Sequence, residues 1–233
     1  VDGFSSFAHM EGTDLFYAFS AHPNVTLTVY NPIHLLFPWK TQGRMHDKYL
    51  IVDDLGYILG GRNMFDYFIG DYPTDSRSYD REVLVYNSAG TKESSLFQLE
   101  AYYKDISQSK ECTLFHNDPK LLEKAAVKEK TELLHDRYDY LLETYPESFQ
   151  EPDYKAKTKP AGKIRLISNP TGIYAKEPVV FYTLSELMKG AREQVILHTP
   201  YAVLNDYMYD TLSSITEKVP VTLLLNAREN GDN

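Results

Sequence analysis

The sequence predicts an α/β protein in which a mixed, largely parallel sheet is flanked by helices and carries an inserted helical segment. Three observations predict this fold class. Strand-like runs dominate residues 25–87, apolar residues at helical spacing dominate residues 91–145, and strand-like and helix-like runs alternate from residue 164 onward. Such alternation is typical of a parallel sheet with helices on its faces.

The first half of the chain contains the runs expected to build a sheet. Thr13-Asp14 is a typical helix start and leads into the apolar run that ends at Ser20. Leu55-Gly56 is a tight-turn signal between two β-rich runs, so we expect these runs to pair as an antiparallel hairpin. The strands predicted in this half span residues 25–30, 48–54, 57–61 and 82–87.

The second half begins with helices and continues past a linker. Apolar residues at helical spacing predict one helical face at Leu96, Leu99, Tyr103 and Ile106, and another at Leu122, Ala126, Leu134, Tyr138 and Leu141. We interpret these helices as structural cover. Residues 150–163 are polar with two prolines and form the best linker candidate. Beyond it we expect strands at 164–168, 194–198 and 221–226, with helices at 181–192 and 204–218.

Composition and charge exclude some classes of function and disfavour others. The 233 residues are 42% hydrophobic and 24% charged, which is ordinary for a folded, water-soluble chain. A net charge of −9 argues against a nucleic-acid partner, because domains that bind nucleic acid through overall charge are usually basic. Cys112 is the only cysteine, which excludes an intrachain disulfide and a cysteine-based zinc site. No apolar run approaches the ~18 residues of a membrane span.

One constellation carries chemistry. His46 and Lys48 are two residues apart, so on a strand they lie on the same side. With Asp53, Gly60-Gly61 and Asn63 they give the pattern His-x-Lys-x(4)-Asp-x(6)-Gly-Gly-x-Asn. This pattern resembles the HKD signature of the phospholipase D superfamily. The neighbouring runs "VYNP" and "MFDYF…YDREVLV" look like its cardiolipin synthase branch, so the resemblance implies a phospholipase D-like fold.

The resemblance implies a phosphohistidine mechanism. A neutral imidazole, with an ordinary pKa near ~6.5, is both a nucleophile for phosphorus and a leaving group, which suits His46. Lys48 and Asn63 would bind the phosphate oxygens, and Gly61 would let the backbone approach them. This scheme requires no metal and no cofactor.

The carboxylates near the motif have different expected roles. Asp53 belongs to the signature, but five residues past Lys48 we expect it to brace the strand and turn. Another carboxylate should orient His46 through its second ring nitrogen, and Asp80 and Glu82 are the candidates. Asp80 is preferred because it matches the family's acidic position. The predicted catalytic set is His46, Lys48, Asp53, Asn63 and Asp80, with Lys48, Gly61 and Asn63 binding phosphate.

The superfamily generally combines two such motifs, and this sequence contains one. The resemblance therefore divides the chain into three parts. Residues 1–107 would be the rear of a first repeat that carries the motif, 108–163 a helical connector and linker, and 164–233 the truncated front of a second repeat. The second motif would come from beyond Asn233 or from a homodimer, so we expect little turnover from the isolated segment.

Three functions remain open at this point. The first is a phosphatidyltransferase or phospholipase D-type enzyme acting on a phospholipid or another phosphodiester. Its parent protein would be membrane-associated and would meet a membrane surface, while the segment itself is soluble. The second is a phosphodiesterase or nuclease of the same superfamily, and the third is a non-catalytic module of the same fold. The intact His46, Lys48 and Asn63 favour catalysis.

Overall fold

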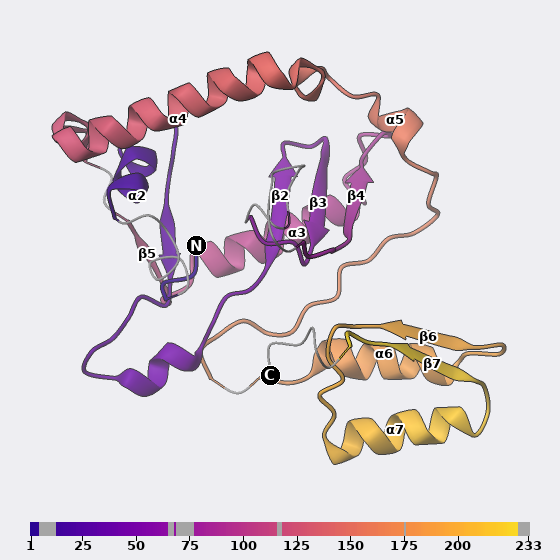
Figure 1. Cartoon of the computed structure of the whole chain (residues 1–233). Coiled ribbons are helices and arrows are strands. Elements are labelled where there is room, and N and C mark those ends of the chain that lie inside the picture. Colours follow the sequence, from indigo (N-terminus) through magenta and orange to yellow (C-terminus); the bar gives the residue numbers. More distant parts are fainter. Residues whose placement is uncertain (5–12, 65–67, 69–76, 116–117, 175, 228–233) are drawn as a thin grey trace. The chain divides into compact units, whose positions relative to one another are not determined.

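A computed structural model describes residues 1–4, 13–64, 68, 77–115, 118–174 and 176–227. The chain forms two compact units, which we describe separately (Figure 1). The first comprises Val1–Leu166 with Thr171–Ala175, and the second comprises Ile167–Pro170 with Lys176–Asn233. The motif lies in the first unit.

The motif folds into a three-stranded antiparallel sheet with the order β2-β3-β4 (Figure 1). The predicted hairpin is confirmed, because Lys48 pairs with Gly60 and Val52 with Gly56. The next strand is confirmed as well, and Gly60 pairs with Glu82. The strands are β2 (Lys48–Val52), β3 (Gly56–Gly60) and β4 (Glu82–Tyr86).

Helix α3 (Ser95–Ser107) covers one face of this sheet. Leu96 and Leu99 are buried against Tyr57 and Val85, which point to the same face by strand alternation. The Tyr57 hydroxyl lies 3.0 Å from Ser95 Oγ, so the polar end of the ring is satisfied inside the core. Three residues of the predicted apolar face, Leu96, Leu99 and Ile106, are therefore buried, whereas Tyr103 is exposed and Tyr102 packs against the core instead.

A second small sheet joins the start of the chain to the segment after α3. Strand β1 (Thr28–Tyr30) pairs antiparallel with β5 (Cys112–Leu114). The sequence did not predict β5, so residues 91–145 are not wholly helical. Helix α2 (Thr13–Ser20), with the predicted start, contacts the long helix α4 (Ala125–Thr144). Four short helical turns lie in the connections of this unit: η1 (Pro38–Gln42), η2 (Pro119–Glu123), η3 (Pro146–Phe149) and α5 (Tyr154–Lys157).

The second unit is a parallel β-α-β arrangement preceded by a helix. Its two strands pair in parallel, with Val195 opposite Val221, and Ile215 packs beside them in the core. The strand predicted at 164–168 is wrong, because these residues form no strand and Leu166 N–H donates to the Gln98 side chain instead. The elements are α6 (Val179–Lys189), β6 (Val195–His198), α7 (Asp206–Thr216) and β7 (Val221–Leu224).

The mixed α/β class is confirmed, but a largely parallel sheet is wrong for the described residues. Two of their three sheets are antiparallel, and only β6 and β7 run parallel. The reason is the connections: β2 and β3 are joined by a tight turn, which reverses the chain, and α3 does not lead back into the same sheet. No helix in the described ranges combines the length and apolarity needed to cross a membrane.

Candidate functional site

His46 and Lys48 lie together at one end of the hairpin. His46 lies just before β2, open to solvent on one side and shielded by protein on the other, and Lys48 is the first residue of that strand. The Lys48 ammonium turns back and donates to the backbone oxygen of His46 at 2.7 Å. The positive charge is therefore held at the residue that the motif assigns as nucleophile.

The surroundings favour a neutral imidazole. Partial burial lowers the pKa of His46 below its ordinary 6.5, and the charge of Lys48 lowers it further. Asp47 and Asp2 oppose this shift, while Arg44 adds to it. Burial also lowers the pKa of Lys48, against the charges of Asp47 and Asp80. A pKa below 6.5 leaves most His46 rings unprotonated at neutral pH, which is the form that can attack phosphorus.

Asp47, between the two motif residues, belongs to the opposite side of the strand. The Tyr102 hydroxyl of α3 donates to Asp47 Oδ2 at 2.6 Å, and the Tyr49 and Tyr102 rings lie 6.3 Å apart, edge to face. Burial and this carboxylate raise the pKa of Tyr102, and burial raises that of Tyr49 to about 12. The contact ties the start of β2 to α3.

The paired glycines make room for the chain that leads into β4. A Cβ on Gly61 would lie 2.6 Å from Asp80 Oδ2, and a Cβ on Gly60 would lie 2.6 Å from Glu82 Cγ. The close approach that the sequence assigned to a phosphate is therefore made here by the protein itself. It brings the Asp80 carboxylate against Gly61, near enough for its charge to act on Lys48.

The predicted orienting contact to His46 is not formed in the described part of the chain. There, no hydrogen bond joins the His46 ring to Asp80 or Glu82. Asp80 Oδ1 instead accepts from the N–H of Arg81 at 2.7 Å, and Glu82 accepts from Arg62. The carboxylates whose charges act on His46 are Asp47 and Asp2.

Arg62 is a site residue that the sequence analysis did not assign. Its guanidinium binds both oxygens of Glu82, and it donates to the backbone oxygens of Phe68 and Asp80. These contacts hold the end of β3 to the start of β4. Arg62 occupies the variable position of Gly-Gly-x-Asn, so the signature gave no reason to single it out.

Asp2 and Arg44 form a second support that the sequence did not reveal. Asp2 is buried, and its two oxygens share the N–H of Arg44 Nε at 3.0 Å each. Its Oδ1 also accepts from Arg44 Nη2 at 2.5 Å, and its Oδ2 accepts from the Met45 N–H at 2.9 Å. The Arg44 guanidinium also lies over the Phe4 ring, 4.6 Å from its centroid. This pair fixes the backbone immediately before His46. Its partners are 42 positions apart, so no local pattern could have joined them.

Asp53 lies at the opposite end of the hairpin. Lys48 and Asp53 are five residues apart along β2, which is about 16 Å at the usual strand rise. Asp53 starts the turn with φ 41°, a left-handed conformation that Asp tolerates better than most residues. Its role in bracing the turn agrees with this position, whereas membership of the phosphate site does not.

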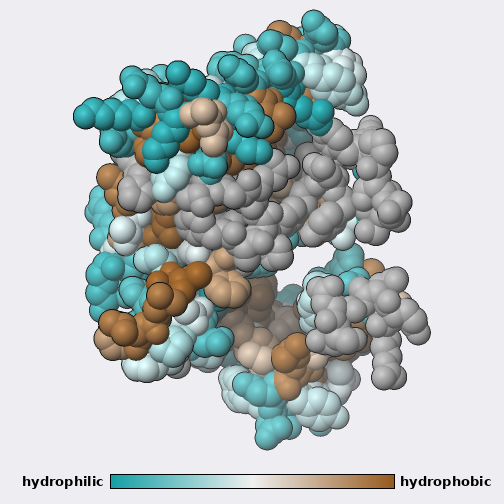
Figure 2. Space-filling view, turned by 60° about the vertical axis from the view of Figure 1, so that its left-hand side comes forward, coloured by the Kyte–Doolittle hydropathy of each residue, from teal (hydrophilic) through white to brown (hydrophobic). Residues whose placement is uncertain are grey.

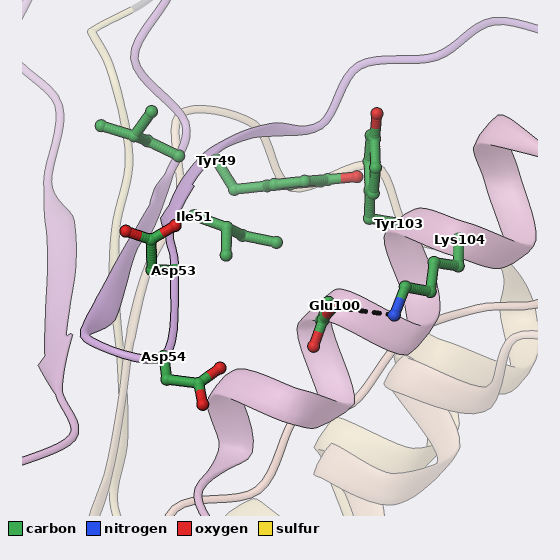
Figure 3. A pocket seen from close by; sticks show the side chains of 8 residues that line it. Tyr49, Ile51, Asp53, Asp54, Glu100, Tyr103 and Lys104 are labelled. Atoms are coloured by element: carbon green, nitrogen blue, oxygen red, sulfur yellow. Dashed lines mark ion pairs between the residues drawn. The ribbon is translucent and has the colours of Figure 1, made fainter. Parts of the chain in front are cut away.

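Asp53 also lines a hollow of about 710 Å³ between β2 and α3 (Figure 3). Asp54 and Glu100 add carboxylates to its wall, and Lys104 is already paired with Glu100 at 2.8 Å. Tyr49 and Ile51 supply the apolar floor on the strand side (Figure 3). Lys92 is likewise paired with Asp54 at 2.7 Å, so both cations are already engaged by carboxylates and the hollow does not fit the anionic substrate that was predicted.

The predicted residues therefore divide into two groups. The structure brings His46, Lys48, Gly61 and Asp80 to one end of the hairpin, and Asn63, partly buried, follows Gly61 by two residues. Asp53 stands apart from them. Among the described residues, no group of three or more His, Cys, Asp or Glu side chains has an arrangement that would hold a metal ion. The flanking residues 65–67 of the motif lie outside the described ranges.

Comparisons of the chain with family models, with characterised proteins and with solved structures give no match. The interpretation of the site therefore depends on its residues and their chemistry.

Proposed function

We propose that the chain is part of a phosphatidyltransferase or phospholipase D-type enzyme, similar to cardiolipin synthases, that acts on phosphodiesters through a phosphohistidine. One observation carries the proposal. An imidazole with a lowered pKa and an ammonium share one end of a hairpin, inside a signature matched at every position. Neutral nucleophile and fixed positive charge are the two requirements for attack on an anionic phosphorus centre.

The reaction would proceed in two displacements. A ring nitrogen of His46 bonds to phosphorus while the bond from phosphorus to the leaving oxygen breaks, and a second imidazole gives that oxygen its proton. The second imidazole then takes a proton from an alcohol or water, whose oxygen displaces His46. Lys48 and Asn63 would stabilise the charge on the non-bridging oxygens. Because the 233 residues contain a single motif, the second imidazole would come from a second copy or from a further part of the protein.

Asp80 takes a different role in this proposal from the one first expected, whereas Asp53 keeps the expected role of bracing the turn. Asp80 would set the position and charge of Lys48 rather than orient the His46 ring. Asp53 would set the turn that fixes the hairpin length. Asp2 and Arg44 would position His46 through the backbone, which makes them positioning residues.

Covalent trapping tests the proposal. The substrate is a short-chain phosphatidyl p-nitrophenyl ester with labelled phosphorus, because its leaving oxygen departs without a proton from the second imidazole. The chain is incubated with it, quenched in alkali and examined for label, because phosphohistidine survives base and is lost in acid. We expect label on the unmodified chain and none on His46→Ala. His135→Ala is the matched control, since His135 is an exposed histidine on α4. Equal labelling of His46→Ala and His135→Ala would exclude His46 as the nucleophile.

A further inference from the structure

The first unit exposes an apolar loop shortly before His46. Residues 33–39, here called the apolar loop, run from the segment after β1 into the start of η1 and end seven positions before His46. Figure 2 shows hydrophobic surface low on the left of the view, at the height that η1 has in Figure 1. The exposed fractions of its large side chains are 49% for Ile33, 89% for Leu35, 83% for Leu36, 43% for Phe37 and 63% for Trp39.

The base of this loop is fixed, so the outward side chains are held there by the fold. Asn31 is buried with φ 45°, and its side-chain amide donates to the backbone oxygens of Lys40 at 2.6 Å and Gly43 at 2.8 Å. Gly43 is buried against Ile173, where a Cβ would approach to 2.4 Å. One amide thus closes the loop across nine and twelve positions.

The loop is also ordered above its base. The Phe37 N–H donates to the His34 oxygen at 3.1 Å, and the Phe37 and Trp39 rings meet edge to face with centroids 5.5 Å apart. Lys40 Nζ lies 4.8 Å from the Phe37 centroid. Phe37 therefore has partners within the loop, while Leu35 and Leu36 point their surface into solvent at its tip.

The sequence around the loop carries few charges. It contains no Asp or Glu between Asp14 and Asp47, and within this span Lys40 and Arg44 follow the apolar residues. The Arg44 charge is offset by its ion pair with Asp2, so Lys40 is the cation that accompanies the apolar side chains of the loop. Apolar side chains at a tip with Trp and Lys behind them match the order of a phospholipid surface, in which acyl chains lie beneath anionic phosphates.

We propose that the apolar loop inserts into the surface of an anionic phospholipid bilayer. Leu35 and Leu36 would enter the acyl boundary, Trp39 would lie at the level of the headgroups, and Lys40 would meet their phosphates. A second copy of the chain fits less well, because a protruding tip exposed above 80% needs a complementary pocket, and the cationic flank favours an anionic partner.

The position of the loop gives this surface a consequence for the reaction, and this step rests on the proposed function. Lys40 and His46 are six positions apart, which spans at most about 22 Å in an extended chain. A loop inserted at Lys40 therefore holds His46 within reach of the headgroup layer, where the phosphodiester of a phospholipid lies. The substrate class would then be a lipid presented in a membrane.

Trp39 is the only tryptophan of the chain, so its fluorescence reports directly on the loop. The chain is titrated with vesicles of phosphatidylcholine alone and of phosphatidylcholine with phosphatidylglycerol. We expect a blue shift of the Trp39 emission with the anionic vesicles, and quenching when the lipid tails are brominated near the headgroup. Leu35→Ser with Leu36→Ser should weaken this binding by about 100-fold, because two apolar side chains lose their burial.

Two control variants separate the loop from other exposed surfaces. Leu133→Ser with Leu187→Ser removes two exposed leucines elsewhere and should leave the vesicle titration unchanged. Lys157→Gln, Lys159→Gln and Lys163→Gln remove three exposed cations of the linker and should weaken binding less than the loop variant does. Stronger loss in the linker variant would assign the membrane contact to the linker and overturn the proposal.

Other outcomes also decide the question. A blue shift that grows with protein concentration in the absence of vesicles would identify a second copy as the occupant. No shift with either vesicle would exclude bilayer insertion. His46→Ala should bind vesicles as the unmodified chain does, and the Leu35→Ser, Leu36→Ser variant should still form the covalent phosphoenzyme with the short-chain, water-soluble lipid. Failure of the loop and failure of the proposed chemistry are therefore distinguishable.

Discussion

The two ends of the β2–β3 hairpin carry residues of the same signature but have different character. At the His46 end, Lys48 is paired with Gly60 in the strand register, and its charge acts on an imidazole. At the other end, Asp53 begins a left-handed turn beside further carboxylates. The spacing of the signature is thus also the length of a hairpin: it brings Lys48 opposite Gly60, and it places Asp53 in the turn.

The comparison teaches that residues matched by one pattern need not meet in one site. The strand register brings Lys48 opposite Gly60, whereas the position of Asp53 reflects the tight reversal of the chain after five strand residues. The contacts that stabilise the two ends also differ. At the His46 end, Arg44 binds Asp2, which is 42 positions away in the sequence. At the turn, the Leu55 N–H donates to the nearby Val52 oxygen at 3.0 Å.

The largest expected effect breaks the distant support. Asp2→Ala removes a buried carboxylate and leaves Arg44 and the Met45 N–H without this acceptor, so we expect the free energy of unfolding to fall by about 3 kcal/mol. Urea unfolding followed by circular dichroism measures it. Asp54→Ala is the control, because the Asp54–Lys92 pair is exposed and such pairs contribute about 1 kcal/mol or less. Equal losses in both variants would contradict a structural role for the buried pair.

A smaller effect tests the turn. Asp53→Gly relieves the left-handed conformation and should keep or slightly raise stability, whereas Asp53→Ala should lower it by about 1 kcal/mol. The same urea experiment compares them. Asp53→Gly should also leave covalent trapping on His46 unchanged, since the two residues lie at opposite ends of the hairpin. If trapping falls with Asp53→Gly while stability is kept, Asp53 acts in the reaction and the contrast between the two ends is lost.

Local patterns predicted the parts of the fold whose information is local. The hairpin, β4, α2 and the buried face of α3 follow from alternation, turn residues and helical spacing, and all are present. β5 is three residues long, and its pairing with β1 depends on chain reversal over more than eighty positions, so no window of sequence displays it. Residues 164–168 have β-rich composition but lack a strand to pair with.

The candidate site was predictable to the same extent. The signature named His46, Lys48 and Gly61, and the fold brings these residues to one end of the hairpin, where Lys48 Nζ donates to the backbone oxygen of His46. Counting residues against the strand rise would have separated Asp53 from them. The Asp2–Arg44 pair and the Arg62–Glu82 pair depend on tertiary packing. The sequence did not show that Arg62 binds Glu82, so Glu82 stayed a candidate for orienting His46. Nearby charges compete for one another, and only the fold decides which pairs form.

The smallest expected effect sharpens the account of the His46 end, because it changes a titration rather than stability. Lys48 lowers the pKa of His46, since a nearby positive charge disfavours protonation of the ring. Lys48→Gln should therefore raise the His46 pKa. The rise should be partial, because burial is the larger cause and remains. Asp47→Asn should shift the pKa the opposite way, because the Asp47 charge favours the protonated ring. Proton NMR of the His46 ring follows both titrations, with His135 as an exposed reference in the same sample. A Lys48→Gln variant whose His46 pKa stays fixed or falls would show that the ammonium does not act on the ring. In that case the two residues would be neighbours along the strand without forming a shared site for one phosphorus centre.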